Sequence, residues 1–270
     1  MPVFEIEEIG DPRLSDYRHV PDPALLRQGE IFVAEGREVV RTLIARSRYT
    51  VRSVLLTATA YRALQDAIAP RLDGLTVYLV TPGSIETLTG YNIHRGCLAI
   101  GERPAPRRVE TLLSAAPGAR RLIVLEAVGN ADNLGGIFRN AAAFRADGVV
   151  LGPGCCDPLY RKAIRVSMGT ALLVPFASAF DWPADLEKLR AAGFQVAALT
   201  PAPGALDIAA AVSLASDRVA LLAGAEGEGL TDAALAAADL RVRIPMAPGI
   251  DSINVATATG IALHRYFTGG

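Results

Sequence analysis

Three short loops in the second half of the chain carry the residue types most able to bind a ligand or perform chemistry. They read GNADNLGGIFRN at 129–140, GAEGEG at 224–229 and IPMAPGIDSINV at 244–255. Each loop follows an apolar run that predicts a β-strand. Ligands bind outside the carboxyl ends of the strands in an open α/β sheet, so we expect the three loops to meet at one sheet edge and form a single site.

The loop at 244–255 turns through Pro245, Pro248 and Gly249. It then restarts as a helix whose first turn is expected to carry Ser252 and Asn254. Small polar side chains and free backbone N–H groups at a helix N-terminus favour an electron-rich group. The sequence therefore predicts a binding loop here, and the alternative is an ordinary capped connection between a strand and a helix.

The loop at 129–140 places Asn133 and several glycines near a helix N-terminus, with Arg139 one to two turns into the helix. A glycine-rich turn between strand and helix suggests a dinucleotide site, but the G-x-G-x-x-G spacing is absent. Arg139 instead suits a phosphate clamp, and the alternative for it is a surface salt bridge.

The loop at 224–229 contains glycines that let a ligand approach the backbone closely. Glu226 and Glu228 disfavour phosphate, because two carboxylates repel it, and they are compatible with a ligand that carries positive charge or hydroxyl groups. The alternative is a flexible acidic turn.

Together the three segments resemble the signature motifs of the SpoU/TrmH family of RNA ribose 2′-O-methyltransferases, in the SPOUT class. The matching positions are Asn133, Gly135 and Arg139 in the first motif, Gly224 to Gly229 in the second, and Ile244 to Val255 in the third. The stretch RKAIRVSMGTAL at 161–172 also resembles the Arg-x-Ser-x-Gly segment of this family.

The sequence departs from the family pattern at a few positions. Asn130-Ala131-Asp132 stands where Asp-Pro-x is usual, Asn140 replaces Thr, Ile253 replaces Leu and Ala256 replaces Ser. None of these changes removes a residue of the implied active site.

The resemblance implies S-adenosylmethionine as the cofactor and no metal. It implies that the cofactor lies on the backbone of Gly224, Ile244 and Met246 and against Ile253, with Leu222 and Gly229 in the same site. The implied catalytic residue is Arg139, oriented with the ribose by Asn133, Glu226, Ser252 and Asn254. Because an Arg side chain stays protonated in proteins, we expect Arg139 to bind the neighbouring phosphate and steady the developing alkoxide, from its own chain or from a dimer partner.

The resemblance also implies the fold class, which is α/β. We expect a C-terminal SPOUT α/β trefoil-knot domain with a parallel sheet at 120–270, although knots are rare in proteins. A smaller L30e-like α/β sandwich domain that binds the RNA substrate is expected at 1–103, with a proline-containing linker at 104–119. A homodimer in which the knot regions pack together is implied as well.

Hydrophobic periodicity predicts the elements that position these loops. In the first half we expect a short helix near 23–28, strands at 31–34, 51–56, 76–80 and 96–100, and helices at 36–47, 59–67 and 82–89. These short alternating elements predict parallel pairing in a three-layer sandwich. In the second half we expect strands at 121–128, 148–151, 171–176, 194–199 and 218–222, helices after the first motif through residue 144 and at 181–192, and a basic helix-like stretch at 158–172.

The chain has 27 basic and 28 acidic residues and a formal net charge of −1, so RNA must be held by a local basic surface. The basic candidates are Arg37, Arg41, Arg46 and Arg48, with Arg161, Lys162 and Arg165. The alternative for the first four is a solvated helix face. Looped or single-stranded bases are the expected target, because a regular duplex exposes little of its bases to read. The appended N-terminal domain favours ribosomal RNA, with transfer RNA as the alternative.

Three cysteines are too few for a disulfide framework, and the three histidines show no zinc spacing. No membrane-length apolar run and no signal peptide are apparent, so we expect a cytoplasmic protein. Two rival functions remain open: a non-catalytic dimeric RNA-binding protein, and a different α/β enzyme that uses NAD or a nucleotide.

Overall fold

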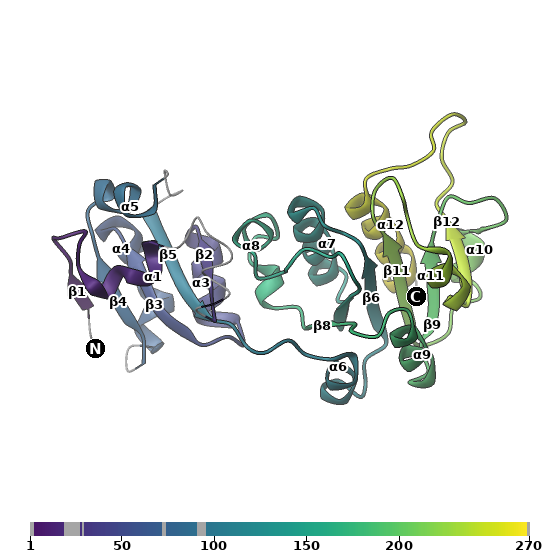
Figure 1. Ribbon diagram of the computed structural model, residues 1–270, viewed down its shortest axis with the longest axis horizontal. Coiled ribbons are helices and arrows are strands. Elements are labelled where there is room, and N and C mark those ends of the chain that lie inside the picture. Colours follow the sequence, from purple (N-terminus) through teal and green to yellow (C-terminus); the bar gives the residue numbers. More distant parts are fainter. Residues whose placement is uncertain (1–2, 19–27, 29, 72–73, 91–95, 269–270) are drawn as a thin grey trace. The chain divides into compact units, whose positions relative to one another are not determined.

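A computed structural model describes residues 3–18, 28, 30–71, 74–90 and 96–268 of the chain (Figure 1). Its contacts divide the chain into two compact units. The first unit comprises Met1–Ala105 with Pro158–Leu173, and the second comprises Pro106–Asp157 with Val174–Gly270. The basic segment Pro158–Leu173, which sequence order assigns to the domain at 120–270, therefore packs with the first unit.

The first unit is built on a five-stranded mixed sheet in the order β1-β4-β3-β5-β2. The strands are β1 (Val3–Glu5), β2 (Ile31–Glu35), β3 (Val51–Leu56), β4 (Thr76–Leu79) and β5 (Cys97–Glu102). β4 is parallel to β1 and β3, whereas β5 is antiparallel to β2 and β3. The expectation of all-parallel pairing is therefore wrong for β5, because an apolar run that is buried on both faces carries no information on strand direction.

Helices cover this sheet on two sides, as predicted. The helical segments are η1 (Pro12–Leu14), α1 (Ser15–Arg18), α3 (Arg37–Arg46), α4 (Ala58–Ile68), η2 (Ala69–Arg71), α5 (Pro82–Thr89), α8 (Arg161–Val166) and η4 (Thr170–Leu172). α3 and α4 pack together and against the sheet, α1 packs on α5, and α8 packs on β2. The helix predicted near 23–28 falls on residues that lie, except for residue 28, outside the described part of the chain.

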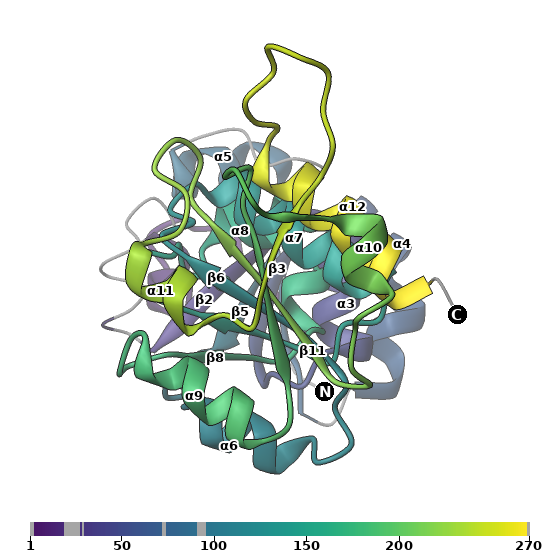
Figure 2. The ribbon, with the colours of Figure 1, turned by 90° about the vertical axis from the view of Figure 1, so that its right-hand side faces the viewer.

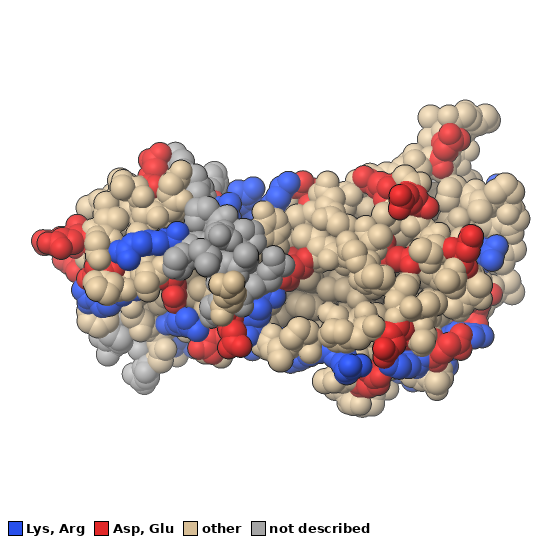
Figure 3. Space-filling view, in the orientation of Figure 1, with Lys and Arg blue, Asp and Glu red and all other residues tan. Residues whose placement is uncertain are grey.

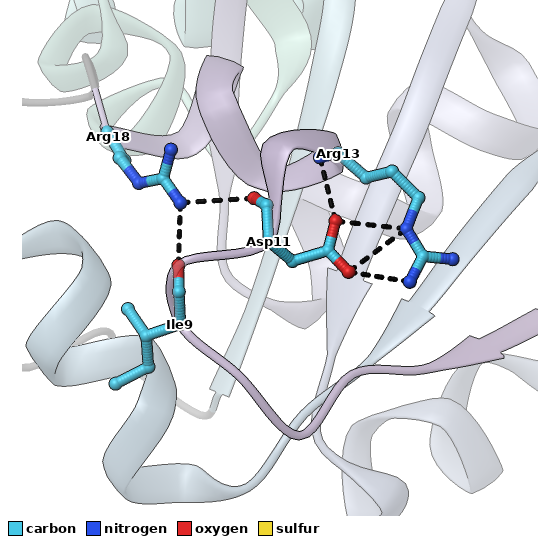
Figure 4. Close-up of polar contacts among 4 residues, drawn as sticks. All are labelled: Ile9, Asp11, Arg13 and Arg18. Atoms are coloured by element: carbon cyan, nitrogen blue, oxygen red, sulfur yellow. Dashed lines mark hydrogen bonds and ion pairs between the residues drawn. The ribbon is translucent and has the colours of Figure 1, made fainter.

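The N-terminal segment joins the sheet of the first unit through β1, and a local ion pair stabilises the turn that follows. The Asp11 carboxylate accepts from the backbone N–H of Arg13, at the start of η1, and also from its guanidinium (Figure 4). Arg18 donates to the backbone carbonyls of Ile9 and Asp11. Leu14 and Tyr17 of the same segment are buried in the core of the first unit, so apolar packing and these polar contacts hold it together.

The second unit contains a seven-stranded sheet in the order β10-β12-β9-β11-β6-β7-β8. The strands are β6 (Arg121–Glu126), β7 (Gly148–Leu151), β8 (Phe176–Ser178), β9 (Gln195–Leu199), β10 (Leu206–Asp207), β11 (Val219–Gly224) and β12 (Leu240–Arg243). Every neighbouring pair in this sheet is parallel. The predicted α/β fold with a parallel sheet is therefore confirmed.

Two helical layers enclose the parallel sheet (Figure 2). The helices are α6 (Val109–Ala115), α7 (Ala131–Ala143), α9 (Ala184–Ala191), α10 (Ile208–Val212), α11 (Asp232–Ala237) and α12 (Val255–Thr268). α12 packs on α7, α10 and β11, while α9 packs on α6, α11 and β9. One core of this unit lies between the sheet and the layer of α6, α9 and α11, where Leu186 and Leu189 of α9 meet Val196 and Leu222 of the sheet.

Two local expectations in the second half are wrong. The strand predicted at 171–176 is instead η4 followed by a turn, and the strand begins only at Phe176. Gly169 adopts the left-handed conformation, with φ of 83°, and the Ser167 hydroxyl accepts from the N–H of Ala171, so the chain is wound too tightly for a strand. The last helix starts at Val255, so Ser252 lies before it and not in its first turn.

The described helices include none with the length and apolarity that a membrane crossing would need. In the same part of the chain, His, Cys, Asp and Glu side chains do not gather in threes with the spacing of a metal site.

Candidate active site

The three motif loops converge in the second unit through a hydrogen-bond network. The side-chain amide of Asn254 donates to Oδ1 of Asn133 at 2.7 Å and to Oε1 of Glu226 at 2.6 Å. The same Glu226 oxygen accepts the backbone N–H of Val255 at 3.3 Å. Residues more than a hundred positions apart in the sequence thus become neighbours.

Asn254 is also the N-cap of α12. Its Oδ1 accepts from the backbone N–H groups of Ala256 and Thr257, at 3.0 and 3.2 Å. Such a cap satisfies donors that have no partner within the helix. The helix start is therefore rigidly linked to the two other loops.

A cleft of about 160 Å³ opens beside this network, at the carboxyl ends of β9, β11 and β12. Its lining includes Gly224, Gly229, Ile244, Met246 and Ile253, which are five of the six residues expected to bind the cofactor. Glu226 and Ser252 also line it. The edge of a parallel sheet is the expected place for a ligand in this class of fold.

Leu222, the sixth residue, does not line the cleft. It is buried within β11 and belongs to the core between the sheet and α9. Leu222 lies two residues before Gly224, where the strand has not yet reached the sheet edge at which the cleft opens, and its side chain therefore packs in the core.

Part of the cleft wall was not expected from the sequence. Leu199, Thr200 and Pro201 line it directly after the end of β9. They carry no recognisable motif, and only the position of the predicted strand end could have pointed to them.

The loop 224–229 closes tightly on itself. Gly229 N–H donates to the carbonyl of Ala225 at 3.1 Å, and a Cβ added at Gly224 would lie 2.4 Å from the backbone of Gly229. Contact this close leaves room only for hydrogen at position 224. The wall of the cleft at this point is consequently main chain.

Arg139 lies in a separate hollow of the second unit, which Asn140, Phe144, Gly260 and His264 also line. The hollow is formed by α7 and α12. Val255 and Ala258 of α12 face the cleft, whereas Ala256, Thr257 and Gly260 face the hollow. The first turns of α12 therefore separate Arg139 from the cleft within one chain.

Arg139 is exposed, and among the residues that the structure describes its guanidinium forms no hydrogen bond or ion pair. The alternative of a surface salt bridge therefore finds no partner in that part of the chain. An uncommitted guanidinium in a hollow is available to bind an anion.

Three of the basic candidates in the first unit, Arg41, Arg161 and Arg165, are engaged in internal ion pairs. Arg41 contacts the carboxylate of Asp66 and holds its pKa below the ordinary value, and it also donates to a backbone carbonyl of α4. Arg161 pairs with buried Glu35 at 2.8 Å. On the face of the second unit seen in Figure 3, acidic and basic side chains are interspersed among large uncharged areas.

Comparison with known proteins agrees with this arrangement. Residues 120–264 match the SpoU rRNA Methylase family. An uncharacterized tRNA/rRNA methyltransferase of Mycobacterium tuberculosis is 43% identical over 269 residues, covering 97% of this chain and 91% of that protein. The 23S rRNA (guanosine(2553)-2′-O)-methyltransferase RlmP of Bacillus subtilis is 24% identical, covering 97% of this chain and 98% of that protein.

A solved structure is similar over both units. The AdoMet-bound rRNA methyltransferase of Sinorhizobium meliloti has a TM-score of 0.82 and 26% sequence identity, covering 99% of this chain and 98% of that chain. The matched residues 120–264 contain all three motifs and the cleft that they form. The chain therefore belongs to the SpoU rRNA methylase family.

Proposed function

We propose that this protein transfers the methyl group of S-adenosylmethionine to a ribose 2′-hydroxyl of structured RNA, with ribosomal RNA favoured over transfer RNA. The observation that carries the proposal is the hydrogen-bonded set of Asn133, Glu226 and Asn254 beside one cleft, which Glu226 lines. The relative RlmP, whose name specifies 2′-O-methylation of 23S rRNA, supports the choice of the ribose hydroxyl.

The cleft suits this cofactor in three respects. Its apolar walls, which include Ile244, Met246 and Ile253, fit an adenine ring. The side-chain-free backbone of Gly224 and Gly229 offers main-chain donors and acceptors to its polar edges. Glu226 supplies negative charge for a cationic ligand.

The bound cofactor would supply a methyl group on a positively charged sulfonium, whose sulfur would leave as the neutral thioether of S-adenosylhomocysteine while the hydroxyl proton passes to water. The task left to the protein is alignment and activation of the hydroxyl. Asn133 and Asn254 are held by the network and would orient the ribose. Ser252 lines the cleft just before α12 begins, and its hydroxyl would form a hydrogen bond with a sugar oxygen.

Arg139 is proposed to bind the phosphate next to the target ribose and to steady the oxygen as it loses its proton. Since α12 separates Arg139 from the cleft of its own chain, we propose a homodimer in which Arg139 of one protomer serves the cleft of its partner. The hollow that α7 and α12 form around Arg139 is the surface assigned to this contact.

The first unit is proposed to hold the RNA. Its similarity to L30e-like domains stays a prediction, as does the trefoil knot of the second unit. Arg46, whose side chain is exposed at the end of α3, is a candidate for this contact. Arg41 and Arg161 would first have to leave their carboxylate partners.

Mapping of ribose methylation tests the proposal. A 2′-O-methyl group removes the nucleophile that drives alkaline cleavage of RNA, so each modified nucleotide leaves a gap in an alkaline ladder. Ribosomal RNA from cells that lack the protein should lose one such protection, and the purified protein with labelled S-adenosylmethionine should restore it.

Three other outcomes would contradict the proposal. RNA binding without transfer of label would favour the non-catalytic dimeric RNA-binding protein. Label on a base, in alkali-sensitive RNA, would refute the ribose as acceptor. Calorimetry that detects NAD but not S-adenosylhomocysteine would favour the nucleotide-dependent alternative.

A further inference from the structure

Glu126 is a buried carboxylate that neither the motifs nor the cleft includes. It is the last residue of β6 and is 2% exposed. Its Oε1 accepts from the indole Nε1 of Trp182 at 2.5 Å and from the hydroxyl of Thr231 at 2.9 Å, and its Oε2 accepts the backbone N–H of Thr231 at 2.9 Å. Three donors from two distant segments thus converge on one side chain.

The donor roles in this cluster are fixed by chemistry. A backbone N–H and an indole N–H can only donate. The Thr231 oxygen already accepts from the N–H of Ala234, at 3.2 Å, so its proton is directed to Glu126. Both carboxylate oxygens must therefore act as acceptors, which an amide at the same position cannot reproduce.

Glu126 touches both ends of the loop that lines the cleft. In the parallel register of β6 and β11, Glu126 is the partner of Gly224, the first residue of the loop. Its side chain holds Thr231, which follows the loop and is the N-cap of α11. The two ends of the segment 224–231 are consequently fastened to one residue.

Trp182 holds the carboxylate from the opposite side. Its ring packs on Gly152, where an added Cβ would lie 3.3 Å from the ring carbons. The indole thus links the end of β7 to Glu126. Trp182 is the single tryptophan of the chain, so its fluorescence reports directly on this cluster.

We propose that Glu126 is a positioning residue for the cofactor: it fixes both ends of the loop 224–231, so that the main chain of Gly224 and Gly229 is set before the cofactor binds. The inference rests on the proposed function, because it assumes that S-adenosylmethionine occupies this cleft. A loop that is ordered in advance binds more tightly, since no ordering entropy is lost on binding.

The test compares S-adenosylhomocysteine affinity, measured by calorimetry, in the wild type and in Glu126→Gln. The variant keeps the volume but presents an N–H group to a donor, and should weaken binding by ~10-fold or more. Hydrogen exchange of the amides at 225–230 should accelerate in the unliganded protein, and the emission of Trp182 should shift. Glu187→Gln, an exposed change on α9 of the same unit, should alter none of these readouts.

Variants at the donors separate positioning from folding. Thr231→Ser keeps both donors and should bind like the wild type, whereas Thr231→Val loses the hydroxyl and should resemble Glu126→Gln. Trp182→Phe removes one donor and keeps the ring, so it provides a milder variant if Glu126→Gln does not fold.

The outcomes distinguish this inference from the function on which it rests. Wild-type affinity and wild-type exchange at 225–230 in Glu126→Gln, or in Trp182→Phe if the former is unfolded, would overturn the inference and leave the proposed function intact. A wild-type protein that does not bind S-adenosylhomocysteine would overturn both.

Discussion

The side-chain amide of Asn254 donates to Oδ1 of Asn133, 2.7 Å away, across 121 positions of sequence. Its second amide proton is directed to Glu226, and its oxygen accepts two backbone N–H groups at the start of α12. Both protons and both lone pairs of this side chain are therefore in use. Only an asparagine can cap the helix and donate to two acceptors at the same time.

Replacing Asn254 by Asp should separate the two roles of this side chain. Aspartate preserves the cap but turns two attractive contacts into repulsions, one of them against the carboxylate of Glu226. We expect the melting temperature to change little and kcat/KM for methyl transfer to fall by about 10- to 100-fold, as for the loss of ~1–3 kcal/mol of hydrogen bonding. Steady-state kinetics with labelled cofactor would measure the loss.

A matched control is Asn130→Asp. Asn130 caps α7 by accepting the N–H of Asp132 at 2.7 Å, and the hydrogen bonds of Asn254 do not involve its side chain. Aspartate is a good cap as well, so activity should stay within about twofold. An equal loss of activity in both variants would show that any added charge near the site is harmful and would remove the special role of Asn254.

Replacing Gly224 by Ala should abolish cofactor binding. The added methyl carbon would meet the backbone of Gly229 at 2.4 Å, and a backbone cannot move aside as a flexible side chain can. Gly227→Ala provides the comparison, because its φ of 89° strains an alanine by about 1 kcal/mol but nothing lies within 4 Å of the new carbon. Calorimetry with S-adenosylhomocysteine should detect binding to the second variant only, and equal affinities would contradict the tight closure of this loop.

Arg139→Ala should lose methyl transfer while S-adenosylhomocysteine binding persists, because Arg139 does not line the cleft. Loss of cofactor affinity instead would refute the assigned role. If Arg139 acts across a dimer, mixing this variant with Gly224→Ala creates hybrid dimers with one complete site, and statistical exchange should restore about a quarter of the activity. A mixture that stays inactive after subunit exchange would show that Arg139 serves its own chain.

Much of the fold is encoded locally and could be predicted. β7 has the predicted bounds of 148–151, and β6 forms from a nearly continuous apolar run, which is typical of a strand buried in a parallel sheet. Strand direction in the first unit could not be predicted, since the run at β5 would be equally apolar in either direction. Among the elements that were missed, α10 and α11 contain five and six residues and are too short to show a clear helical period.

The candidate site was predictable as far as its motifs extend. Asn133, Glu226 and Asn254 are brought together because all three loops leave or flank the same sheet edge, as expected for loops that each follow a strand of an α/β sheet. Glu126 and Thr231 could not be found in this way, because a buried carboxylate at a strand end has no motif and its partners depend on tertiary packing. The separation of Arg139 from the cleft could not be predicted either. The side of α12 on which Arg139 lies depends on how α7 and α12 pack, which the spacing of the motif does not show.

Replacing Glu35 by Gln should destabilise the first unit. Glu35 ends β2 with a side chain that is 2% exposed, and it pairs with Arg161 of α8 at 2.8 Å, with Arg165 at 3.9 Å. Because Arg161 is itself 23% exposed, we expect a loss of about 1–3 kcal/mol, below the cost of breaking a fully buried pair. Chemical denaturation would measure it, and Asp16→Asn, at the exposed pair with Arg52, should cost below about 1 kcal/mol. If the two variants lost equal free energies of unfolding, the burial of Glu35 would not be the cause of its larger expected effect.

The ion pair of Asp11 and Arg13 should give the first unit a stability term that depends on acid pH (Figure 4). Hydrogen bonds from the Arg13 side chain and backbone lower the pKa of the Asp11 carboxyl from 3.8 to about 2. The folded state favours the ionised form of the Asp11 carboxyl. Its contribution to the free energy of unfolding is therefore complete above pH 3.8 and disappears as the pH falls towards 2. Asp11→Asn should therefore melt below the wild type at neutral pH, by a small margin because the pair is exposed, and the two curves should merge near pH 2. Added salt should narrow the neutral-pH difference, and a difference that persists unchanged at pH 2 would show that it does not arise from the charge of Asp11.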